Sequence, residues 1–255
     1  SFVMGIRKGI RNTGDKHSIL FTKFNQTIAR TYRLSSSEPN FQNQPRGNTF
    51  PVRRCIISRW ADIGGKIMDA DFGQLEFKCA GILSKAESIK RDVAKGIDVH
   101  AQTRDTINAA GGSVDRQDAK PHTFKPLYGG QYGLPYEMAY YKAFLEQYYP
   151  EVAEWHTKLQ NDAIIHHMIT LPTGRQYAFP DASRNKWGNA TGATKIKNYP
   201  VQGFATADIV PISGIILMNS LRTSELKSLF INTVHDSHVL DIYPVEEEQV
   251  ADIVM

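Results

Sequence analysis

Two aspartates stand where the surrounding sequence is of apolar strand type. Asp71 ends the stretch IMDAD, and Asp236 lies at the tip of NTVHDSHVLDI. Carboxylates at two strand ends can converge on hard cations such as Mg²⁺, and a pair of such ions stabilises the attacking and leaving oxygens of an in-line phosphoryl displacement. A simpler interpretation is that each Asp fills a turn, as Asp commonly does. The pattern alone leaves both interpretations open.

A second set of residues has the spacing of one helix face. Arg116, Lys120, Phe124 and Tyr128 follow one another at intervals of four in DRQDAKPHTFKPLYGG. Residues four apart lie along the same side of a helix. Two cations followed by two aromatic rings suit a nucleoside triphosphate, with charge for the phosphates and rings for the sugar and base. The alternative is a solvated basic face that runs into a core stripe.

Tyrosines are concentrated in one part of the chain. Seven of the eleven fall between residues 128 and 149. Such a cluster could form a platform on which bases stack, or it could be helix packing with hydroxyl groups at the surface. We favour packing from Tyr140 onward.

Hydrophobic periodicity and turn residues define the elements that must position these side chains. Asp98 and Asp115 are expected helix caps, and the Gly111–Gly112 pair is an expected helix stop. Strands, a helical block and a hairpin, in that order, predict an α+β fold with a helical insertion. The expected elements are strand and turn at 18–34, loop at 35–51, a strand through 72, a helix over 74–83, helices from 98 and from 115, helix over 136–171 with a break at Pro150, turn and loop at 173–185, helix over 201–228, and strand, tight turn and strand over 229–244.

The composition excludes several classes of protein. Of 255 residues, 41% are apolar and 22% charged, unlike disordered or membrane-spanning chains. The longest apolar run, 209–218, is interrupted and too short to cross a bilayer, and the start SFVMGIRKGIRNTG has no apolar signal-peptide core. Cys55 and Cys79 make no disulfide framework or metal quartet, so we interpret both as packing residues in a reducing compartment.

Charge is distributed unevenly along the chain. The formal net charge is +4, but residues 1–60 hold eleven Lys or Arg and two acids, a balance of +9, whereas the remaining residues balance to −5. This asymmetry indicates a polyanion-binding segment beside an acidic site. The basic residues of the segment are Arg7, Lys8, Arg11, Lys16, Lys23, Arg30, Arg33, Arg46, Arg53, Arg54 and Arg59.

Five stretches, in this order, resemble the polymerase domain of family A DNA polymerases, the DNA polymerase I-like group. Together they span nearly the whole chain, and the form TFKPLYGG is closer to phage members of the family than to bacterial repair enzymes. The stretches are TYRLSSSEPNFQNQPR (31–46), DADFGQLEFKCAG (69–81), RQDAKPHTFKPLYGG (116–130), NYPVQG (198–203) and TVHDSHVLDI (233–242).

The resemblance implies a right-hand architecture, in which an antiparallel palm sheet receives an insertion of helical fingers. We expect residues 1–86 to form the first part of the palm with the end of the thumb, 87–190 the fingers, and 191–255 a truncated second part of the palm. Most of the thumb, an exonuclease domain and the last palm strands have no counterpart in the sequence. We therefore expect a fragment of a longer polymerase.

The resemblance also implies a role for each candidate residue. Asp71 and Asp236 would bind two Mg²⁺ ions, for which Mn²⁺ is a possible substitute, with help from the backbone carbonyl of Phe72. Lys120 would supply a proton or charge to the departing pyrophosphate. Arg116, Lys120 and His100 would contact the triphosphate. Phe124 would contact the sugar, and Tyr128 would lie near the templating base. The residues that would contact primer–template DNA are Arg33, Asn40, Gln42, Asn43, Gln202 and His235. Glu76 matches the steric gate that excludes a ribose 2′-OH.

Some positions depart from the family pattern. Ser237 follows Asp236 where the family usually has Glu, which we expect to weaken metal binding without abolishing it. Pro121 and Pro126 lie inside the predicted nucleotide helix, where Pro typically costs about 3 kcal/mol and kinks the helix. Thr194 stands where the family often has Arg near the primer terminus, with Lys195 and Lys197 close to it in the sequence.

The expected function is DNA-directed 5′→3′ DNA synthesis from deoxynucleoside triphosphates on a primer–template. Two alternatives remain: a catalytically incomplete DNA-binding fragment of such a polymerase, and a single-subunit RNA polymerase, against which Glu76 argues. We expect no membrane association and a location in the cytoplasm of a bacterium or a phage-infected host.

Overall fold

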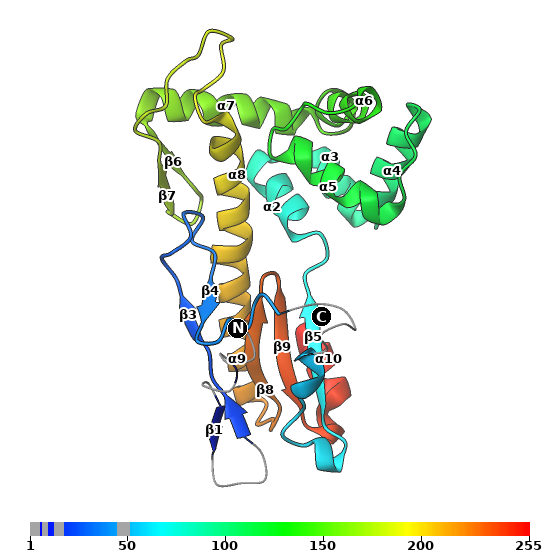
Figure 1. Ribbon diagram of the computed structural model, residues 1–255, viewed down its shortest axis with the longest axis vertical. Coiled ribbons are helices and arrows are strands. Elements are labelled where there is room, and N and C mark those ends of the chain that lie inside the picture. The colour runs from blue at the N-terminus through cyan, green and yellow to red at the C-terminus, as the bar shows by residue number, and fades with distance from the viewer. Residues whose placement is uncertain (1–5, 7–9, 13–17, 45–51) are drawn as a thin grey trace. The chain divides into compact units, whose positions relative to one another are not determined.

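A computed structural model of the chain describes residues 6, 10–12, 18–44 and 52–255 (Figure 1). Its contacts divide it into two compact units, one formed by Ser1–Gly73 with Ala205–Met255 and the other by Gln74–Phe204. We call them the sheet unit and the helical unit. Their limits differ from the expected boundaries after residues 86 and 190, because α2 (Leu75–Ser84) packs on α3 (Glu87–Ala94), α7 (Pro150–His166) and α8 (Ala193–Gly203).

The sheet unit is built on a three-stranded antiparallel sheet in the order β5-β9-β8 (Figure 1). The strands are β5 (Lys66–Asp71), β8 (Leu229–Val234) and β9 (Ser237–Ile242). Helices α9 (Val210–Thr223) and α10 (Glu247–Val254) pack on each other, and α9 also contacts β8. A core of Leu217, Leu221, Leu240, Ile242 and Val250 joins the sheet to these helices.

Two short hairpins complete the described part of the sheet unit. The first pairs β1 (Ile10–Asn12) with β2 (Ser18–Leu20), and the second pairs β3 (Lys23–Asn25) with β4 (Ser35–Ser37). The prediction of loop at 35–51 was therefore wrong over β4, whose three serines pair through their backbone and give no apolar alternation. Residues 45–51 of that predicted loop lie outside the described residues.

The helical unit contains most of the helices. Two of its buried clusters lie within residues 77–201 and 159–196. Tyr140, Tyr141 and Tyr149 are each buried, which confirms packing for these tyrosines, and Tyr148 lies partly buried against the same cluster. The expectation of hydroxyl groups at the surface was wrong for Tyr140 and Tyr149, whose hydroxyls bond to Thr103 and Asp92 inside the unit. Besides α2, α3, α7 and α8, the elements are α4 (Val99–Ala109), α5 (Arg116–Leu127), α6 (Pro135–Ala143), the π-helical η3 (Phe144–Tyr148), and the strands β6 (Met168–Thr170) and β7 (Gln176–Ala178).

The predicted helix ends are confirmed at α4 and α5. The Asp98 side chain accepts from the backbone N–H groups of His100 and Ala101, and Asp115 caps α5 in the same way. Side-chain oxygens at this position replace acceptors that the first turn of a helix lacks. The chain leaves α4 through Gly111, whose φ of +94° favours glycine.

Elsewhere the predicted helices have the wrong limits. Residues 168–178 form the hairpin β6-β7 in place of the end of a helix and a loop, because His167 takes a left-handed conformation that ends α7. Helix α8 begins at Ala193, earlier than the predicted 201, and α9 ends at Thr223, before the predicted 228. Helix α3 was not predicted. Its apolar positions are too few in a short segment to give a clear period.

One helical segment among the described residues, Ala193–Thr223, is long and apolar enough by length and composition to cross a membrane. Half of the most apolar stretch of this segment is buried inside the structure, and core helices of soluble proteins meet the same criterion.

Cys79 is buried as expected, and burial raises its pKa to about 12. Cys55 is exposed, so its interpretation as a packing residue was wrong.

Candidate functional site

Strand pairing in the sheet unit brings the two candidate metal aspartates together. Asp71 is the last residue of β5, and in the β5–β9 register it stands opposite Ser237. The N–H of Phe72 donates to the carbonyl of Asp236 at 3.0 Å. Asp71 is exposed and Asp236 is half-buried. Two carboxylates and the adjoining backbone therefore lie at one end of the sheet, although they are far apart in sequence.

The turn that holds Asp236 is short and tightly bonded. Val234 pairs with Ser237, so His235 and Asp236 alone connect β8 to β9. His235 has φ +58°, a left-handed conformation in which His occurs more often than most residues. The Ser237 hydroxyl donates to Val234 O at 3.1 Å, and Thr233 Oγ1 donates to Ser237 O at 3.1 Å. The side chain that replaces the family's usual Glu is thus used inside the turn.

A buried histidine, not identified from the sequence, supports the backbone beside the aspartates. The His238 ring lies edge-on to Phe72 at 5.5 Å and to Phe230 at 5.1 Å. The Ser213 hydroxyl donates to Val210 O at 2.8 Å, so its oxygen must accept from His238 Nε2 at 2.9 Å. Burial lowers the pKa of His238 and favours its neutral form. The alternation of residues along β9 could have predicted that His238 is buried, since Leu240 and Ile242 lie on the same inward face of the strand.

The candidate DNA contacts of the sheet unit have structural partners of their own. Asn40 Oδ1 accepts from the backbone N–H groups of Gln42 and Asn43 at 3.1 and 2.9 Å. Gln42 is buried, and its Nε2 donates to Thr233 O at 3.3 Å, which ties the segment to β8. Asn43 is exposed and Arg33 is half-buried. Asn40 and Gln42 therefore shape the segment, and their roles in binding DNA stay predictions.

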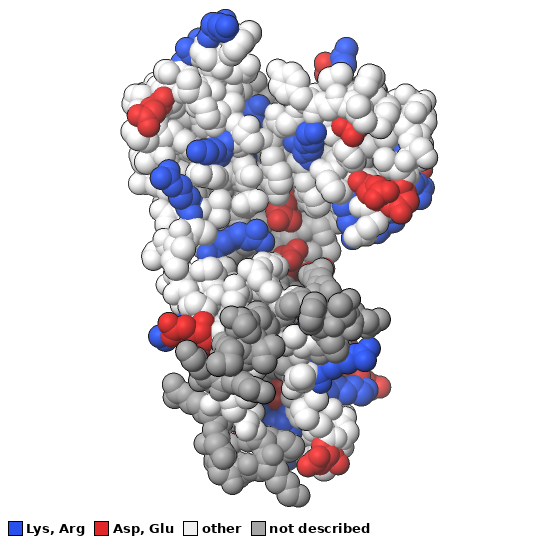
Figure 2. Space-filling model, in the orientation of Figure 1, with Lys and Arg blue, Asp and Glu red and all other residues white. Residues whose placement is uncertain are grey.

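The basic N-terminal segment is described only in part. Arg7, Lys8, Lys16 and Arg46 lie outside the described residues, as does the side chain of Arg11. On the face drawn in Figure 2, Lys and Arg side chains are interspersed with Asp and Glu. The predicted polyanion-binding segment therefore stays a prediction.

In the helical unit, α5 presents its aromatic residues on one face. The rings of Phe124 and Tyr128 are nearly parallel, with an interplanar angle of 18° and centroids 6.3 Å apart. The His100 ring, from α4, lies 5.5 Å from Phe124. Helix α5 runs from Arg116 to Leu127 with both Pro121 and Pro126 inside it. The prolines therefore do not break the four-residue spacing of the aromatic pair.

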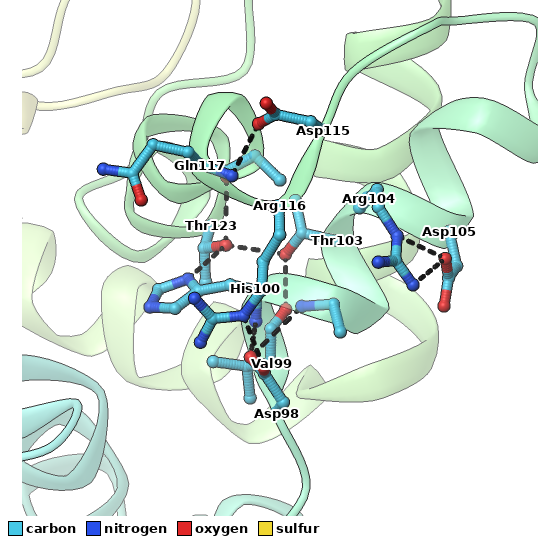
Figure 3. Close-up of polar contacts among 12 residues, drawn as sticks. Asp98, Val99, His100, Thr103, Arg104, Asp105, Asp115, Arg116, Gln117 and Thr123 are labelled. Carbon is cyan, nitrogen blue, oxygen red and sulfur yellow. Dashed lines mark hydrogen bonds and ion pairs between the residues drawn. The ribbon is translucent and has the colours of Figure 1, made fainter.

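Arg116 is held by an acidic residue of the neighbouring helix. Arg116 Nε donates to Asp98 Oδ2 at 2.6 Å, while Asp98 Oδ1 accepts from the N–H groups at the start of α4 (Figure 3). This hydrogen bond lowers the pKa of Asp98 and raises that of Arg116. One carboxylate thus both caps α4 and orients a candidate phosphate ligand. The sequence predicted the cap but gave no signal for the ion pair.

We predict that Asp98→Ala lowers the free energy of unfolding by about 1 kcal/mol, the usual cost of losing a helix cap, whereas Asp98→Asn has a much smaller effect because Asn caps equally well. Urea unfolding followed by circular dichroism measures both. Since Arg116 depresses the pKa of Asp98, the stabilisation by its carboxylate is present above the unfolded-state pKa and is lost as the pH falls through the folded-state pKa. Equal losses in the two variants would contradict the capping role.

His100 lies between the two helices and is buried. Its Nδ1 is 3.0 Å from Thr123 Oγ1 (Figure 3). Burial lowers the pKa of His100, the Asp98 carboxylate opposes this effect, and the charges of Arg116 and Lys120 add to it. Both candidate phosphate-binding cations of α5 are therefore close enough to His100 to affect its charge.

The remaining candidates of the helical unit are Glu76 and Gln202. Glu76 lies in the first turn of α2 and Gln202 in α8, and both are half-buried. Thr194 and Lys195 are exposed, whereas Lys197 is buried, and burial lowers its pKa. A Cβ at Gly129 would collide with the Lys197 side chain. Lys197 therefore packs on the turn after α5.

The two units offer different chemistry. In the sheet unit, paired carboxylates and a backbone carbonyl supply the oxygen ligands that hard divalent cations prefer. In the helical unit, cationic side chains and an aromatic face supply what a nucleoside triphosphate needs. Among the described residues, no group of three or more His, Cys, Asp or Glu could hold a metal. Asp71 and Asp236 are two carboxylates and fall below that number, so their role as a cation site stays a prediction.

Comparisons with known proteins match nearly the whole chain. The model of the family "DNA polymerase family A" matches residues 3–255. The chain is 32% identical to "DNA polymerase I, thermostable" of Thermus caldophilus, over 94% of this chain and 29% of that protein. It is 28% identical to "DNA polymerase I" of Bacillus subtilis, over 98% of this chain and 29% of that protein. It thus spans less than a third of the length of these relatives.

A solved structure has the same fold. It is described as the POL domain of Pol1 from M. smegmatis in complex with DNA primer-template and dNTP. The TM-score is 0.80 at 24% identity, and the match covers 99% of this chain and 46% of that one. The α+β fold expected from the sequence is therefore confirmed.

Proposed function

We propose that this chain, which belongs to DNA polymerase family A, catalyses the template-directed addition of deoxynucleotides to a primer 3′-OH. The observation that carries the proposal is the β5–β9 register, in which Asp71 stands opposite Ser237 and therefore beside Asp236. In this proposal the sheet unit belongs to the palm and the helical unit is the fingers. The relatives named DNA polymerase I support the activity. From the form of TFKPLYGG we further propose that the chain is of the phage type within the family.

Asp71, Asp236 and the carbonyl of Phe72 would hold two Mg²⁺ ions, with Mn²⁺ as a substitute. Their oxygens fit a hard cation, and when bound such ions would stabilise the attacking and leaving oxygens of the displacement. Phe72 is held in place by its hydrogen bond to Asp236 and by the His238 ring. Ser237 adds no carboxylate, so we expect weaker metal binding than in relatives with Glu at this position.

The triphosphate would be bound by Arg116, Lys120 and His100. Asp98 engages Nε of Arg116, which leaves Nη1 and Nη2 for phosphate oxygens. Phe124 would lie against the sugar and select nucleotides with a 3′-OH, and Tyr128 would stack near the templating base. The nearly parallel rings of these two residues support that assignment.

The DNA would be contacted by residues that do not read sequence. Minor-groove acceptors are similar in all base pairs, so contacts there check pairing geometry. Lys and Arg side chains of the N-terminal segment would bind DNA phosphates, and their contribution to DNA affinity should fall with rising salt. The proposed contact residues are Arg33, Asn40, Gln42, Asn43, Gln202 and His235. We place the protein in the cytoplasm of a bacterium or a phage-infected cell, where its DNA substrate would be.

Primer extension tests the proposal. A labelled primer–template, four deoxynucleoside triphosphates and Mg²⁺ or Mn²⁺ are incubated with the purified chain, and extended primers are resolved by length. Metal-dependent extension supports the proposal. Salt-dependent binding of the primer–template without any extension would instead support a DNA-binding fragment, an alternative favoured by the small share of each relative that the chain spans.

We predict that Glu76→Ala raises ribonucleotide incorporation relative to deoxynucleotide incorporation by about 10- to 200-fold, the range for one small group admitted to or excluded from a pocket. Competition between dATP and ATP on one template measures the ratio. Glu76→Gln, which keeps the volume, is the control and should discriminate as the wild type does. A wild-type chain that prefers ATP would favour the single-subunit RNA polymerase instead.

A further inference from the structure

Thr123 stands between His100 and a second buried hydroxyl. Its Oγ1 lies 3.0 Å from His100 Nδ1 and 2.7 Å from Thr103 Oγ1 (Figure 3). It is also 3.2 Å from Ala119 O, which is the longest of its contacts. His100, Thr103 and Thr123 are all buried. The protons of this cluster must therefore come from its own members.

Thr103 makes two further short contacts. Its Oγ1 lies 2.7 Å from Val99 O and 2.8 Å from the Tyr140 hydroxyl. Together with the contacts of Thr123 Oγ1 to Thr103 Oγ1 and to Ala119 O, these are four oxygen–oxygen pairs, and each needs one proton between the two oxygens. The hydroxyls of Thr103, Thr123 and Tyr140 carry one proton each. The three protons serve the three pairs at 2.7–2.8 Å, so the longer contact of Thr123 Oγ1 with Ala119 O is left without one. The carbonyl of Val99, which can only accept, takes the proton on Thr103.

No hydroxyl proton is left for the contact with His100. The bond between Thr123 Oγ1 and His100 Nδ1 must then use a proton on the ring nitrogen, so His100 donates and Thr123 accepts. A neutral imidazole has one N–H, and with that proton on Nδ1 its Nε2 is a bare acceptor. A bare acceptor repels phosphate oxygens. Nε2 can donate to a phosphate only after the ring gains a second proton.

We infer that Thr123 is a positioning residue for nucleotide binding, because it holds His100 in the Nδ1–H form and so makes its phosphate contact available only to the imidazolium. This inference rests on the proposed function, in which His100 contacts the triphosphate. Nucleotide binding would then take up one proton at Nε2. The contact between Thr123 and His100 would thus make nucleotide affinity depend on pH.

The surroundings set the direction of that dependence. The charged groups that face His100 are Asp98 at the start of α4 and Arg116 and Lys120 on α5. Tyr140, from α6, is neutral because burial raises its pKa. The net effect lowers the pKa of His100, so the ring is neutral near pH 7 in the free protein. Affinity for a triphosphate should therefore fall as the pH rises above that pKa, by up to tenfold per pH unit.

The first experiment needs no nucleotide. Nitrogen-15 NMR of the histidine side chains in the free chain distinguishes a protonated from a bare ring nitrogen. At a pH where His100 is neutral, we expect a protonated Nδ1 and a bare Nε2. Thr123→Ser should keep this form, and Thr123→Val, which has the same shape but no acceptor, should move the proton to Nε2. A wild-type His100 with the proton on Nε2 would overturn the inference, whether or not Thr123→Val folds.

The second experiment measures dATP affinity by calorimetry at about pH 6 and about pH 8, in buffers of different ionisation enthalpy that report proton uptake. We expect the wild type and Thr123→Ser to lose affinity on going to the higher pH and to take up a proton, and Thr123→Val to lose much less because its neutral ring can donate from Nε2. Ionisation of dATP itself cancels in the comparison. A Thr123→Val variant with wild-type pH dependence would overturn the inference, whereas absence of dATP binding in the wild type would overturn the proposed function itself.

Discussion

Asp71→Asn and Asp236→Asn each lower the rate of primer extension by on the order of 10³-fold, while the fold is kept. Removing a metal-binding carboxylate loses several kcal/mol of charge stabilisation in the transition state, and each 1.36 kcal/mol is a factor of ten. Asparagine has nearly the same shape, so the β5–β9 pairing beside it should persist. Single-turnover extension with saturating Mg²⁺ measures the rate, and circular dichroism checks the fold.

Asp69→Asn is the matched control for these variants. Asp69 is an exposed acid on the same strand as Asp71, opposite Val239 and two residue pairs further from the turn. Its replacement should leave the rate within about twofold, since surface substitutions away from a site have small effects. Binding of Mn²⁺ to the three variants, followed by electron paramagnetic resonance, gives a readout independent of activity. Wild-type extension by both Asp71→Asn and Asp236→Asn would show that the metal assignment is wrong.

Lys120→Ala lowers kcat by about 10²- to 10⁴-fold, the usual contribution of a positioned proton donor. In the proposed function this ammonium supplies a proton or charge to the departing pyrophosphate. Lys120→Arg separates the two roles, because arginine keeps the charge but does not give up a proton in proteins. A variant with arginine that recovers most of the rate would mean that charge alone is needed.

Lys125→Ala is the control on the same helix. The Lys125 ammonium lies 5.0 Å from the centroid of the Tyr141 ring, against α6. We expect this replacement to reduce stability slightly, by about 0.5–1 kcal/mol, and to leave kcat near the wild-type value. Rapid-quench measurement of the first turnover compares all three variants. If Lys120→Ala and Lys125→Ala have the same kcat, Lys120 has no special role in the reaction.

Two features of the helical unit link its stability to its proposed chemistry. Asp98 caps α4 and holds Arg116, and Thr123 connects His100 to buried hydroxyls. In both cases a group expected to contact phosphate is oriented by a neighbour that the motif does not include. Preorganised ligands bind with less loss of conformational entropy. Variants of Asp98 and Thr123 are therefore expected to change nucleotide affinity more than they change the fold.

Several features followed from the sequence by itself because they depend on neighbours along the chain. The caps at Asp98 and Asp115 need only atoms two or three residues away. The turn at Asp236 needs apolar strand residues on either side of two turn residues. The ordered motifs were sufficient to predict the family, and the order of strands and helices predicted the α+β fold.

The tertiary structure alone decided the features that depend on segments distant in sequence. The β5–β9 register brings Asp71 to Asp236, Asp98 pairs with Arg116, and His238 supports Phe72. The exposure of Cys55 and the hairpin β6-β7, which replaces a predicted helix end, were likewise not predictable. The physical reason is that strand pairing and burial are sums over contacts from the whole unit, whereas a cap or a tight turn is satisfied within a few residues.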